Sequence, residues 1–382
     1  MNIVFYGGHH WETGPWFRKQ QFASRLAERG HKIFYIESSV SMLKKTSKHK
    51  NLYLKTQSKE INDNLFIISP STLFPLPNNY YSRKLFNLKL LFDVKQILKR
   101  EKVTEYLLWF NQLEFASILP IKNVKVVFDL ADDRPFYNKL AGDEKGYRVT
   151  LNYVKHAFLK SDISIVSAVK IREKYQKFSK SDIAVVPNGH NFNLDKKPNL
   201  VTKKTMLKNI QSPIIGFIGT LFRFIDDNLL EYIISKRSSY NFVFIGPVET
   251  NFPIQKLKKY KNVSLLGQQK KELIPSYITD FDVCLNPFKV HEVNDSVSPV
   301  KVFEYLASEK PVLSTRMYSL EKEDISQNIV FADNYNDYLL KLDQLVNGQL
   351  KTEIIRDTVK DYAWDNLFLR LLSELKKHNL EL

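Results

Sequence analysis

The sequence predicts an α/β protein built from two doubly wound domains, and three observations lead to this fold class. Short apolar, strand-like runs alternate with helical stretches over the first 190 residues, a polar stretch at 188–213 interrupts the pattern, and the same alternation restarts at 214. Strands this apolar, separated by helices, are typical of parallel sheets covered on both faces. The 382 residues are also sufficient for two domains of ordinary size. We therefore expect an N-terminal domain at 1–195 and a C-terminal domain at 210–361.

The individual elements follow from local signals. The stretch 15–30 has helical periodicity and ends at Gly30, which suits the residue after a helix. The C-terminal stretch 352–382 is expected to be helical throughout. The predicted strands are 2–7, 32–37, 64–70, 106–111, 125–131, 163–168 and 183–188, followed by 214–219, 241–247, 263–267, 282–288, 311–315 and 328–332.

The composition is strongly basic, with a formal net charge of +16 and a pI near 9.5. Such a charge favours nucleic acid, an anionic membrane surface or phosphorylated small molecules as partners, but a lysine-rich solvated surface has the same composition. The run 44–59 carries six lysines and no acid, and is predicted to be a loop. The helix expected at 80–102 alternates Leu85, Leu88 and Phe92 with lysines. It could lie on anionic lipid, or pack against the core with a basic outer face.

Other features are typical of a cytoplasmic protein. No run approaches the ~18 apolar residues of a membrane span. The stretch MNIVFYGG has no basic region followed by a long apolar one, so we expect no signal peptide. The single cysteine, Cys284, lies in an apolar run and is predicted to be a buried thiol.

The stretch 298–310 contains a helix start that suits an anion. Ser298 is the expected N-cap and Pro299 the first helical residue, so the amides that follow lack partners. Lys301 lies in the first turn, where the helix dipole disfavours a cation unless an anion is bound. Glu304 lies on the same face and could accept two hydroxyl hydrogen bonds from a ribose. This pattern suits a nucleoside diphosphate, and the alternative is a solvent-exposed Lys301–Glu304 pair.

Two further groups of polar residues follow predicted strands in the N-terminal domain. Gly7 and Gly8 allow close backbone approach, and His9 and His10 are the titratable groups of that loop. The histidines could act as general bases, contact an acceptor or be structural. The run DLADD places Asp129, Asp132 and Asp133 after another strand. Helix capping or an acceptor contact suits these aspartates better than metal binding.

The motif P-x-K-x-x-E-Y-L-A-x-x-K-P-V at 299–312 resembles the nucleotide-sugar signature of GT-B glycosyltransferases of the family 4 type. The resemblance covers most of the chain, through landmarks such as VVFDLADDRPFY, VPNGHNF and IIGFIGTLFRFIDDNLLEYI, and is closest to bacterial cell-envelope enzymes. It implies two Rossmann-like domains facing a cleft, with a helix at about 362–382 that crosses back to the N-terminal domain. It also implies donor binding by the C-terminal domain, no cofactor and no divalent metal.

Matched by position, the family implies roles for individual residues. Glu304 corresponds to the ribose-binding glutamate, and Arg223 is the candidate for the basic residue at the diphosphate. The donor is expected to contact Gly8, Gly219, Thr220, Arg223, Ser298, Pro299, Val300, Lys301 and Glu304, and the reaction to involve His9, His10, Asp132, Arg223 and Lys301.

Two positions depart from the family pattern. Many members carry a sugar-contacting glutamate eight residues before the ribose-binding one, but here that position is Ser296, with Glu292 and Asp295 out of register. Many members also end an N-terminal strand in His-Asp, whereas this chain has Ala131 before Asp132. The sequence therefore leaves the donor sugar open.

The function expected from these features is transfer of a sugar from a nucleoside-diphosphate sugar, with UDP as the expected nucleotide, to a glycan or lipid-linked acceptor. The resemblance implies retention at the anomeric carbon, a role in bacterial cell-surface polysaccharide synthesis, and a cytoplasmic enzyme that can associate with the inner face of the membrane. The alternatives are a GT-B epimerase or hydrolase, and a charge-driven nucleic-acid-binding protein. The latter is disfavoured because no nucleic-acid motif is present. A NAD-dependent oxidoreductase using Glu37 is disfavoured because the G-x-G-x-x-G fingerprint is missing.

Overall fold

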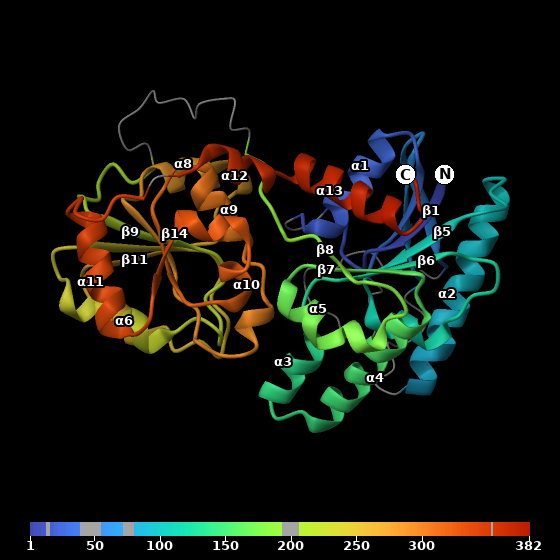
Figure 1. The fold of residues 1–382 in the computed structure, drawn as a ribbon, viewed down its shortest axis with the longest axis horizontal. Helices are drawn as coiled ribbons and strands as arrows, with labels where there is room; N and C mark the ends of the chain where they lie inside the picture. The colour runs from blue at the N-terminus through green and yellow to red at the C-terminus, as the bar shows by residue number, and fades with distance from the viewer. Residues whose placement is uncertain (13–15, 39–54, 72–79, 193–205, 353) are drawn as a thin grey trace. The chain divides into compact units, whose positions relative to one another are not determined.

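A computed structural model describes residues 1–12, 16–38, 55–71, 80–192, 206–352 and 354–382 (Figure 1). The chain divides into two compact units: unit 1 comprises Met1–Val186 and Phe368–Leu382, and unit 2 comprises Pro187–Leu367. Most of the predicted basic loop, 44–54, and part of the predicted domain boundary, 193–205, lie outside the described residues.

Unit 1 contains an eight-stranded sheet, within the described residues, of order β3-β4-β2-β1-β5-β6-β7-β8. Every neighbouring pair is parallel except β3 with β4. The direction of strand succession reverses at β1, which places a crevice beyond the carboxyl ends of β1 and β5. The strands are β1 (Asn2–Tyr6), β2 (Lys32–Ile36), β3 (Gln57–Asn62), β4 (Leu65–Ser69), β5 (Leu107–Phe110), β6 (Val126–Leu130), β7 (Ile163–Val166) and β8 (Ala184–Val185).

The prediction of a loop through residue 59 was wrong at its end, because β3 forms there. Its sequence, QSKEIN, has a single apolar residue, so no apolar alternation marks it as a strand. It forms as an antiparallel edge strand whose backbone pairs with β4.

The two helices predicted in unit 1, at 15–30 and 80–102, form within those bounds. Gly30 follows α1 with φ +88°, and the amide of His31 donates to the Leu26 carbonyl, so the predicted glycine stop is confirmed. The helices are α1 (Arg18–Glu28), α2 (Tyr80–Arg100), α3 (Arg134–Leu140), α4 (Glu144–Lys160) and α5 (Val169–Tyr175), with 3₁₀ turns η1 (Leu113–Ile118) and η2 (Gln176–Phe178).

Helix α2 confirms the core-packing alternative for part of its apolar residues and leaves the lipid-binding alternative untested. One face, with Phe86, Leu90 and Val94, is buried in the core cluster that also contains residues of the sheet and of η1. The other face carries Leu85 and Phe92, which are 66% and 58% exposed. Core packing therefore explains only half of the apolar pattern of this helix.

Unit 2 contains, among its described residues, a six-stranded parallel sheet of order β11-β10-β9-β12-β13-β14. The succession reverses at β9, and α6 packs with α11 while α9 packs with α12 over the sheet (Figure 1). Cys284 is fully buried in β12, as predicted. The strands are β9 (Ile214–Ile218), β10 (Asn241–Ile245), β11 (Val263–Gly267), β12 (Val283–Asn286), β13 (Val312–Thr315) and β14 (Ile329–Ala332). The helices are α6 (Asp227–Lys236), α7 (Gln255–Lys258), α8 (Ile274–Thr279), α9 (Val300–Ala307), α10 (Tyr318–Glu321), α11 (Tyr335–Val346) and α12 (Arg356–Asp361), with 3₁₀ turns η3 (Lys271–Leu273), η4 (Asn294–Ser296) and η5 (Asp324–Asn328).

The C-terminal stretch is not one continuous helix, so that prediction was wrong. Helix α12 ends at Asp361 and α13 (Trp364–Lys377) begins three residues later. Between them, the amide of His190 donates to the Tyr362 carbonyl and the amide of Trp364 donates to the His190 carbonyl. This backbone pairing interrupts the helical hydrogen bonds. Among the described residues, no helix has the length and apolarity needed to cross a bilayer.

The close approach of two loops in unit 2 leads to a stability prediction. Gly246 has φ +136°, and a Cβ added there would lie 2.2 Å from the Gly219 carbonyl oxygen. We expect Gly246→Ala to lower the free energy of unfolding by about 2–4 kcal/mol, through backbone strain and this clash. Gly348→Ala is the control, because its φ of +68° is also positive but its Cβ would meet nothing. It should cost only about 1 kcal/mol. Equal losses in urea unfolding would contradict the steric explanation.

Candidate functional site

The strand reversal in unit 2 brings Lys301 to the carboxyl ends of β9 and β12. Ligands of doubly wound sheets bind at such a reversal. Lys301 Nζ lies 4.4 Å from the ring centroid of Phe217 in β9 and 4.7 Å from that of Phe288, which follows β12. Gly219, with φ +139°, leaves room for this side chain, since a Cβ there would lie 3.3 Å from Nζ. The lysine is therefore held by two aromatic faces at the edge where a ligand is expected.

The start of α9 differs from the prediction in one respect. The N-cap is Pro299 rather than Ser298, and the helix begins at Val300. The Ser298 hydroxyl oxygen instead accepts a hydrogen bond from the Asn188 amide at 3.0 Å, and the Ser298 carbonyl accepts one from Asn188 Nδ2 at 2.8 Å. No side chain caps α9 and its first turn has no acid. The helix start thus remains a candidate anion site, while Ser298 fixes the preceding segment.

Lys301 and Glu304 are half-buried and lack compensating polar partners. Within the described part of the chain, neither the ammonium nor the carboxylate makes a hydrogen bond or ion pair. Burial lowers the pKa of Lys301 to about 7, which the charge of Glu304 only partly offsets. Burial also raises the pKa of Glu304 to about 7, against the opposing effect of Lys271 and Lys301. Two desolvated charges of this kind are typical of a site completed by a ligand.

The other residues predicted near the diphosphate are less constrained. Arg223 is exposed, with its guanidinium 4.8 Å from the Phe224 ring centroid. Thr220 is half-buried in the loop after β9. Their contacts with a ligand remain predictions.

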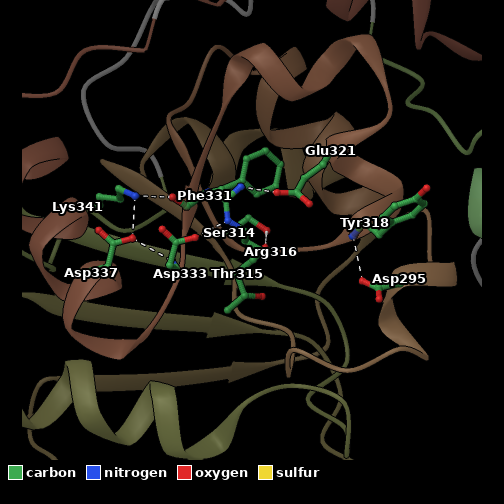
Figure 2. A network of polar contacts seen from close by, with 10 residues as sticks. All are labelled: Asp295, Ser314, Thr315, Arg316, Tyr318, Glu321, Phe331, Asp333, Asp337 and Lys341. Carbon is green, nitrogen blue, oxygen red and sulfur yellow. Dashed lines mark hydrogen bonds and ion pairs between the residues drawn. The ribbon is translucent and has the colours of Figure 1, made fainter.

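The structure accounts for the carboxylates that lie out of register with the expected sugar contact. Asp295 Oδ1 accepts a hydrogen bond from the Tyr318 amide at 3.0 Å, and the Asp295 carbonyl accepts one from the Ser319 hydroxyl (Figure 2). Asp295 thereby fixes the start of α10. Ser296 is 3% exposed, and Glu292 is exposed.

Two cations of unit 2, Arg316 after β13 and Lys341 of α11, are engaged within the protein. Arg316 pairs with both Glu321 and Asp333 (Figure 2). Lys341 Nζ donates to Asp337 Oδ2 at 2.7 Å and to the Phe331 carbonyl at 2.8 Å. The contrast with Lys301 is clear, because these cations have carboxylate partners.

Unit 1 builds a second cluster at its own reversal, after β1 and β5. Gln112, which follows β5, donates from Nε2 to the Gly7 carbonyl at 3.1 Å. His9 Nδ1 accepts a hydrogen bond from Lys19 Nζ at 3.1 Å. Burial, together with the charge of Lys19, lowers the pKa of His9 to about 4. His9 is therefore neutral near pH 7, and because an ammonium group can only donate, we assign the proton of the ring to Nε2. Lys19, which the sequence analysis did not single out, sets this state.

His10 has the opposite electrostatic environment. Its Nδ1 lies 3.5 Å from Glu37 Oε2, and this hydrogen bond raises the pKa of His10. Burial alone would raise the pKa of Glu37, but hydrogen bonds from His10, Trp11 and Ser69 outweigh it and lower that pKa. Glu37 thus fixes the loop that contains His10. Because its carboxylate is engaged in these hydrogen bonds, Glu37 no longer argues for a bound dinucleotide.

The three aspartates of DLADD have separate surroundings. Asp129 forms a buried ion pair with Arg18, with Nη2 and Oδ1 3.0 Å apart. Asp133 accepts hydrogen bonds from Lys174 at 2.5 Å and from the Tyr175 hydroxyl at 2.6 Å. Asp132 keeps an accessible side chain, and crowding by protein atoms raises its pKa although Lys19 and Arg18 oppose the shift. Asp132 is thus the one of the three available for an acceptor.

Comparisons with known proteins agree with this architecture. Residues 212–347 match the family model described as glycosyl transferases group 1. A Bacillus subtilis strain 168 protein named as the teichuronic acid biosynthesis glycosyltransferase TuaH is 25% identical over 205 residues. That match spans 51% of this chain and about half, 52%, of the relative.

Solved structures cover nearly the whole chain. Sucrose-phosphate synthase from Thermosynechococcus elongatus superposes with a TM-score of 0.68 at 14% identity, covering 98% of both chains. The E. coli trehalose-6-phosphate structure bound with UDP-2-fluoro glucose gives a TM-score of 0.67 at 13% identity, covering 99% of both chains. The predicted GT-B fold, with its two parallel-sheet domains, is confirmed.

The desolvated lysine leads to a prediction on stability. The folded pKa of Lys301, about 7, lies below its ordinary 10.5, so folding disfavours the charged form. We expect Lys301→Met to raise the free energy of unfolding of the ligand-free protein by about 1 kcal/mol at neutral pH. The gain should be fully present below pH ~7 and fade toward pH ~10, where Lys301 is neutral in both states. Lys258→Met, at an exposed lysine, is the control in thermal unfolding; a gain at Lys301 independent of pH would contradict the electrostatic cause.

The two histidines of the first loop should titrate at different pH values. In imidazole ¹⁵N NMR spectra we expect His9 to stay neutral, as the Nε2–H tautomer, down to about pH 5. His10 should titrate above its ordinary value. Glu37→Gln should lower the pKa of His10 by removing the carboxylate, and leave His9 unchanged. Parallel titration of both rings would refute the assignment.

Proposed function

We propose that this chain, a GT-B fold whose residues 212–347 match glycosyl transferases group 1, transfers a sugar from a nucleoside-diphosphate sugar to a hydroxyl acceptor. The observation that carries the proposal is the Lys301–Glu304 pair, half-buried and without polar partners among the described residues, at the strand reversal of unit 2. Because the match to TuaH spans about half of each protein, the activity is our inference.

In the proposed complex, the donor supplies what the two charged groups lack. The diphosphate faces Lys301 and the amides at the start of α9, so the lysine regains its charge against an anion. The Glu304 carboxylate accepts hydrogen bonds from the ribose hydroxyls. These bonds replace the water that burial has removed from the carboxylate. UDP is the first nucleotide to test, since the E. coli neighbour is bound with UDP-2-fluoro glucose.

The proposed chemistry is transfer with retention of anomeric configuration. As the sugar–phosphate bond breaks, negative charge grows on the leaving diphosphate, where Lys301, the helix amides and Arg223 stabilise it. The leaving phosphate oxygen then takes the proton of the attacking acceptor hydroxyl. In unit 1, His9 donates a hydrogen bond from Nε2 and Asp132 accepts one, which suits the hydroxyls of a sugar. We assign no step to a metal.

The acceptor we propose is a glycan or lipid-linked sugar in cell-surface polysaccharide synthesis. The support is the similarity to a protein named for teichuronic acid biosynthesis, together with the net charge of +16. A basic protein acting on such an acceptor is expected to work at the inner face of the membrane. The buried Ser296 leaves the identity of the donor sugar to experiment.

The test is a binding panel of UDP-, GDP- and dTDP-sugars by thermal shift and calorimetry. We expect at least one to bind wild type, and Glu304→Ala to weaken it by about 10- to 100-fold, since a hydrogen bond to a charged group contributes about 1.5–3 kcal/mol. Glu231→Ala is the matched control, because Glu231 lies on α6 of the same unit and its carboxylate already pairs with Lys259.

Calorimetry in buffers of different ionisation enthalpy gives a second readout. Donor binding near pH 8 should take up a proton at Lys301, whose pKa of about 7 rises against the diphosphate. Binding unaffected by Glu304→Ala would refute the site. Donor turnover that is independent of any acceptor would favour the hydrolase or epimerase alternative.

A further inference from the structure

The solvent-facing side of α2 carries one continuous line of exposed residues along its length. Positions 81, 85, 88, 92, 95 and 99 alternate in steps of four and three, which keeps them on one face of a helix. The first four are Tyr81, Leu85, Leu88 and Phe92, with exposed fractions of 78%, 66%, 46% and 58%. The line then continues with exposed Lys95 and Lys99. The helix surface is thus apolar for three turns and basic for the last two.

This apolar line is not part of the unit 1 core. The core face of α2 is formed by a different set, which includes Phe86, Leu90 and Val94 at 6%, 2% and 1% exposure. Single exposed apolar residues are ordinary, but a contiguous row of large ones marks an interaction surface. Lys84 and Lys89 lie beside the row, and Lys89 is bonded to Asp93 of the same helix.

The basic end of the line opens into a pocket of about 950 Å³ in unit 1. Lys95 and Lys99 of α2 line it, together with Tyr106, whose hydroxyl is buried and has no hydrogen-bond partner in the described residues. Three further lysines and one carboxylate complete its ionisable side chains, namely Lys102, Lys122, Lys125 and Glu105. One of these lysines, Lys125, donates to the Asn379 carbonyl at 2.8 Å.

The pocket lies apart from the candidate catalytic loops of unit 1. Its walls include Asn2, Leu107 and Lys125, at the amino ends of β1, β5 and β6. Gly8, His9 and Asp132 follow the carboxyl ends of β1 and β6, at the opposite edge of the same sheet. A ligand of this pocket is therefore neither the donor nor the acceptor at the reaction centre.

We propose that the apolar line of α2 and the lysine pocket together form a surface that binds an anionic lipid bilayer. Leu85, Leu88 and Phe92 would enter the boundary between headgroups and acyl chains, as the apolar face of an interfacial helix does. The lysines would meet lipid phosphates.

The combination of lysines and exposed apolar side chains favours a bilayer over other partners. Nucleic acid would use the lysines and leave the apolar line in water, whereas a bilayer satisfies both. A second copy docking by the same face would bring like charges together, which is unfavourable. This inference names the surface by which the chain would reach the membrane, and its biological purpose rests on the proposed function. Vesicle binding itself is measurable without any enzymatic step.

The test is flotation of the full chain with vesicles of phosphatidylcholine alone or mixed with phosphatidylglycerol. We expect wild type to float with the anionic vesicles at about 50 mM salt and to be largely released at about 500 mM. Lys95→Gln/Lys99→Gln should weaken binding by about fivefold per lysine, the ratio that corresponds to about 1 kcal/mol for each basic residue at an anionic surface. Leu85→Ser/Phe92→Ser should also reduce binding and increase the salt sensitivity of what remains.

Matched controls separate a local surface from general charge. Lys258→Gln/Lys261→Gln removes two exposed lysines of unit 2, and Leu340→Ser/Leu369→Ser removes two exposed leucines elsewhere. Both controls should float like wild type. The proposal is overturned if wild type stays unbound at low salt, if the control pairs lose as much binding as the α2 pairs, or if duplex DNA displaces the protein from vesicles while Leu85→Ser/Phe92→Ser has no effect.

Donor binding, followed by thermal shift in every variant, distinguishes this inference from the proposed function. All surface variants should keep the wild-type shift. Vesicle binding without any nucleotide-sugar binding would uphold the surface and refute the function, and the reverse result would do the opposite.

Discussion

The reversal of strand order in each sheet is the constraint on which both candidate sites depend. Neighbouring crossover connections leave in opposite directions at β1 and at β9, so the loops that follow these strands are not covered by a helix. In unit 2 this opening receives Lys301 from α9 and Phe217 from β9. In unit 1 it receives the loop of His9 and His10. Residues of very different sequence position meet there because parallel strands end at the same edge.

The two sites differ in whether their charged groups have polar partners within the protein. In unit 1 the loop is fixed by protein groups, with Lys19 on His9 and Glu37 on His10. In unit 2 the sheet edge keeps Lys301 without a carboxylate partner among the described residues, while Arg316 nearby has two. A protein that only had to be stable would replace or pair such a lysine, since burying a lone charge is costly. Binding of a diphosphate, as proposed above, would explain why Lys301 stands at this position.

Part of the large positive charge of the chain is gathered on one surface of unit 1. Composition alone allowed nucleic acid, membrane or an ordinary solvated surface as the reason for it. The arrangement of α2 concentrates lysines beside exposed leucine and phenylalanine side chains. A surface that is both basic and apolar is better matched to a bilayer than to a polyanion in water.

The sequence by itself determined the fold class, most strands, the glycine stop of α1, and the placement of Lys301 and Glu304 on one helix. These follow from local signals: apolar runs, caps, and residues three apart on one helix. It did not reveal β3, whose side chains carry no apolar pattern, or the break before Trp364, which a backbone bond from distant His190 creates. Ser298 was misassigned as a cap because its partner, Asn188, lies 110 residues away.

Only the tertiary structure decided which charges are satisfied. Asp129, Asp132 and Asp133 are equivalent in sequence, yet Arg18 and Lys174 engage the first and the last from other elements. The state of His9 likewise depends on Lys19, a contact between a loop and a helix. The outward direction of Leu85 and Phe92 was also undetermined, because helical periodicity places apolar residues on faces without saying which face meets the core. Partner identity and burial arise from long-range packing, which local sequence patterns do not encode.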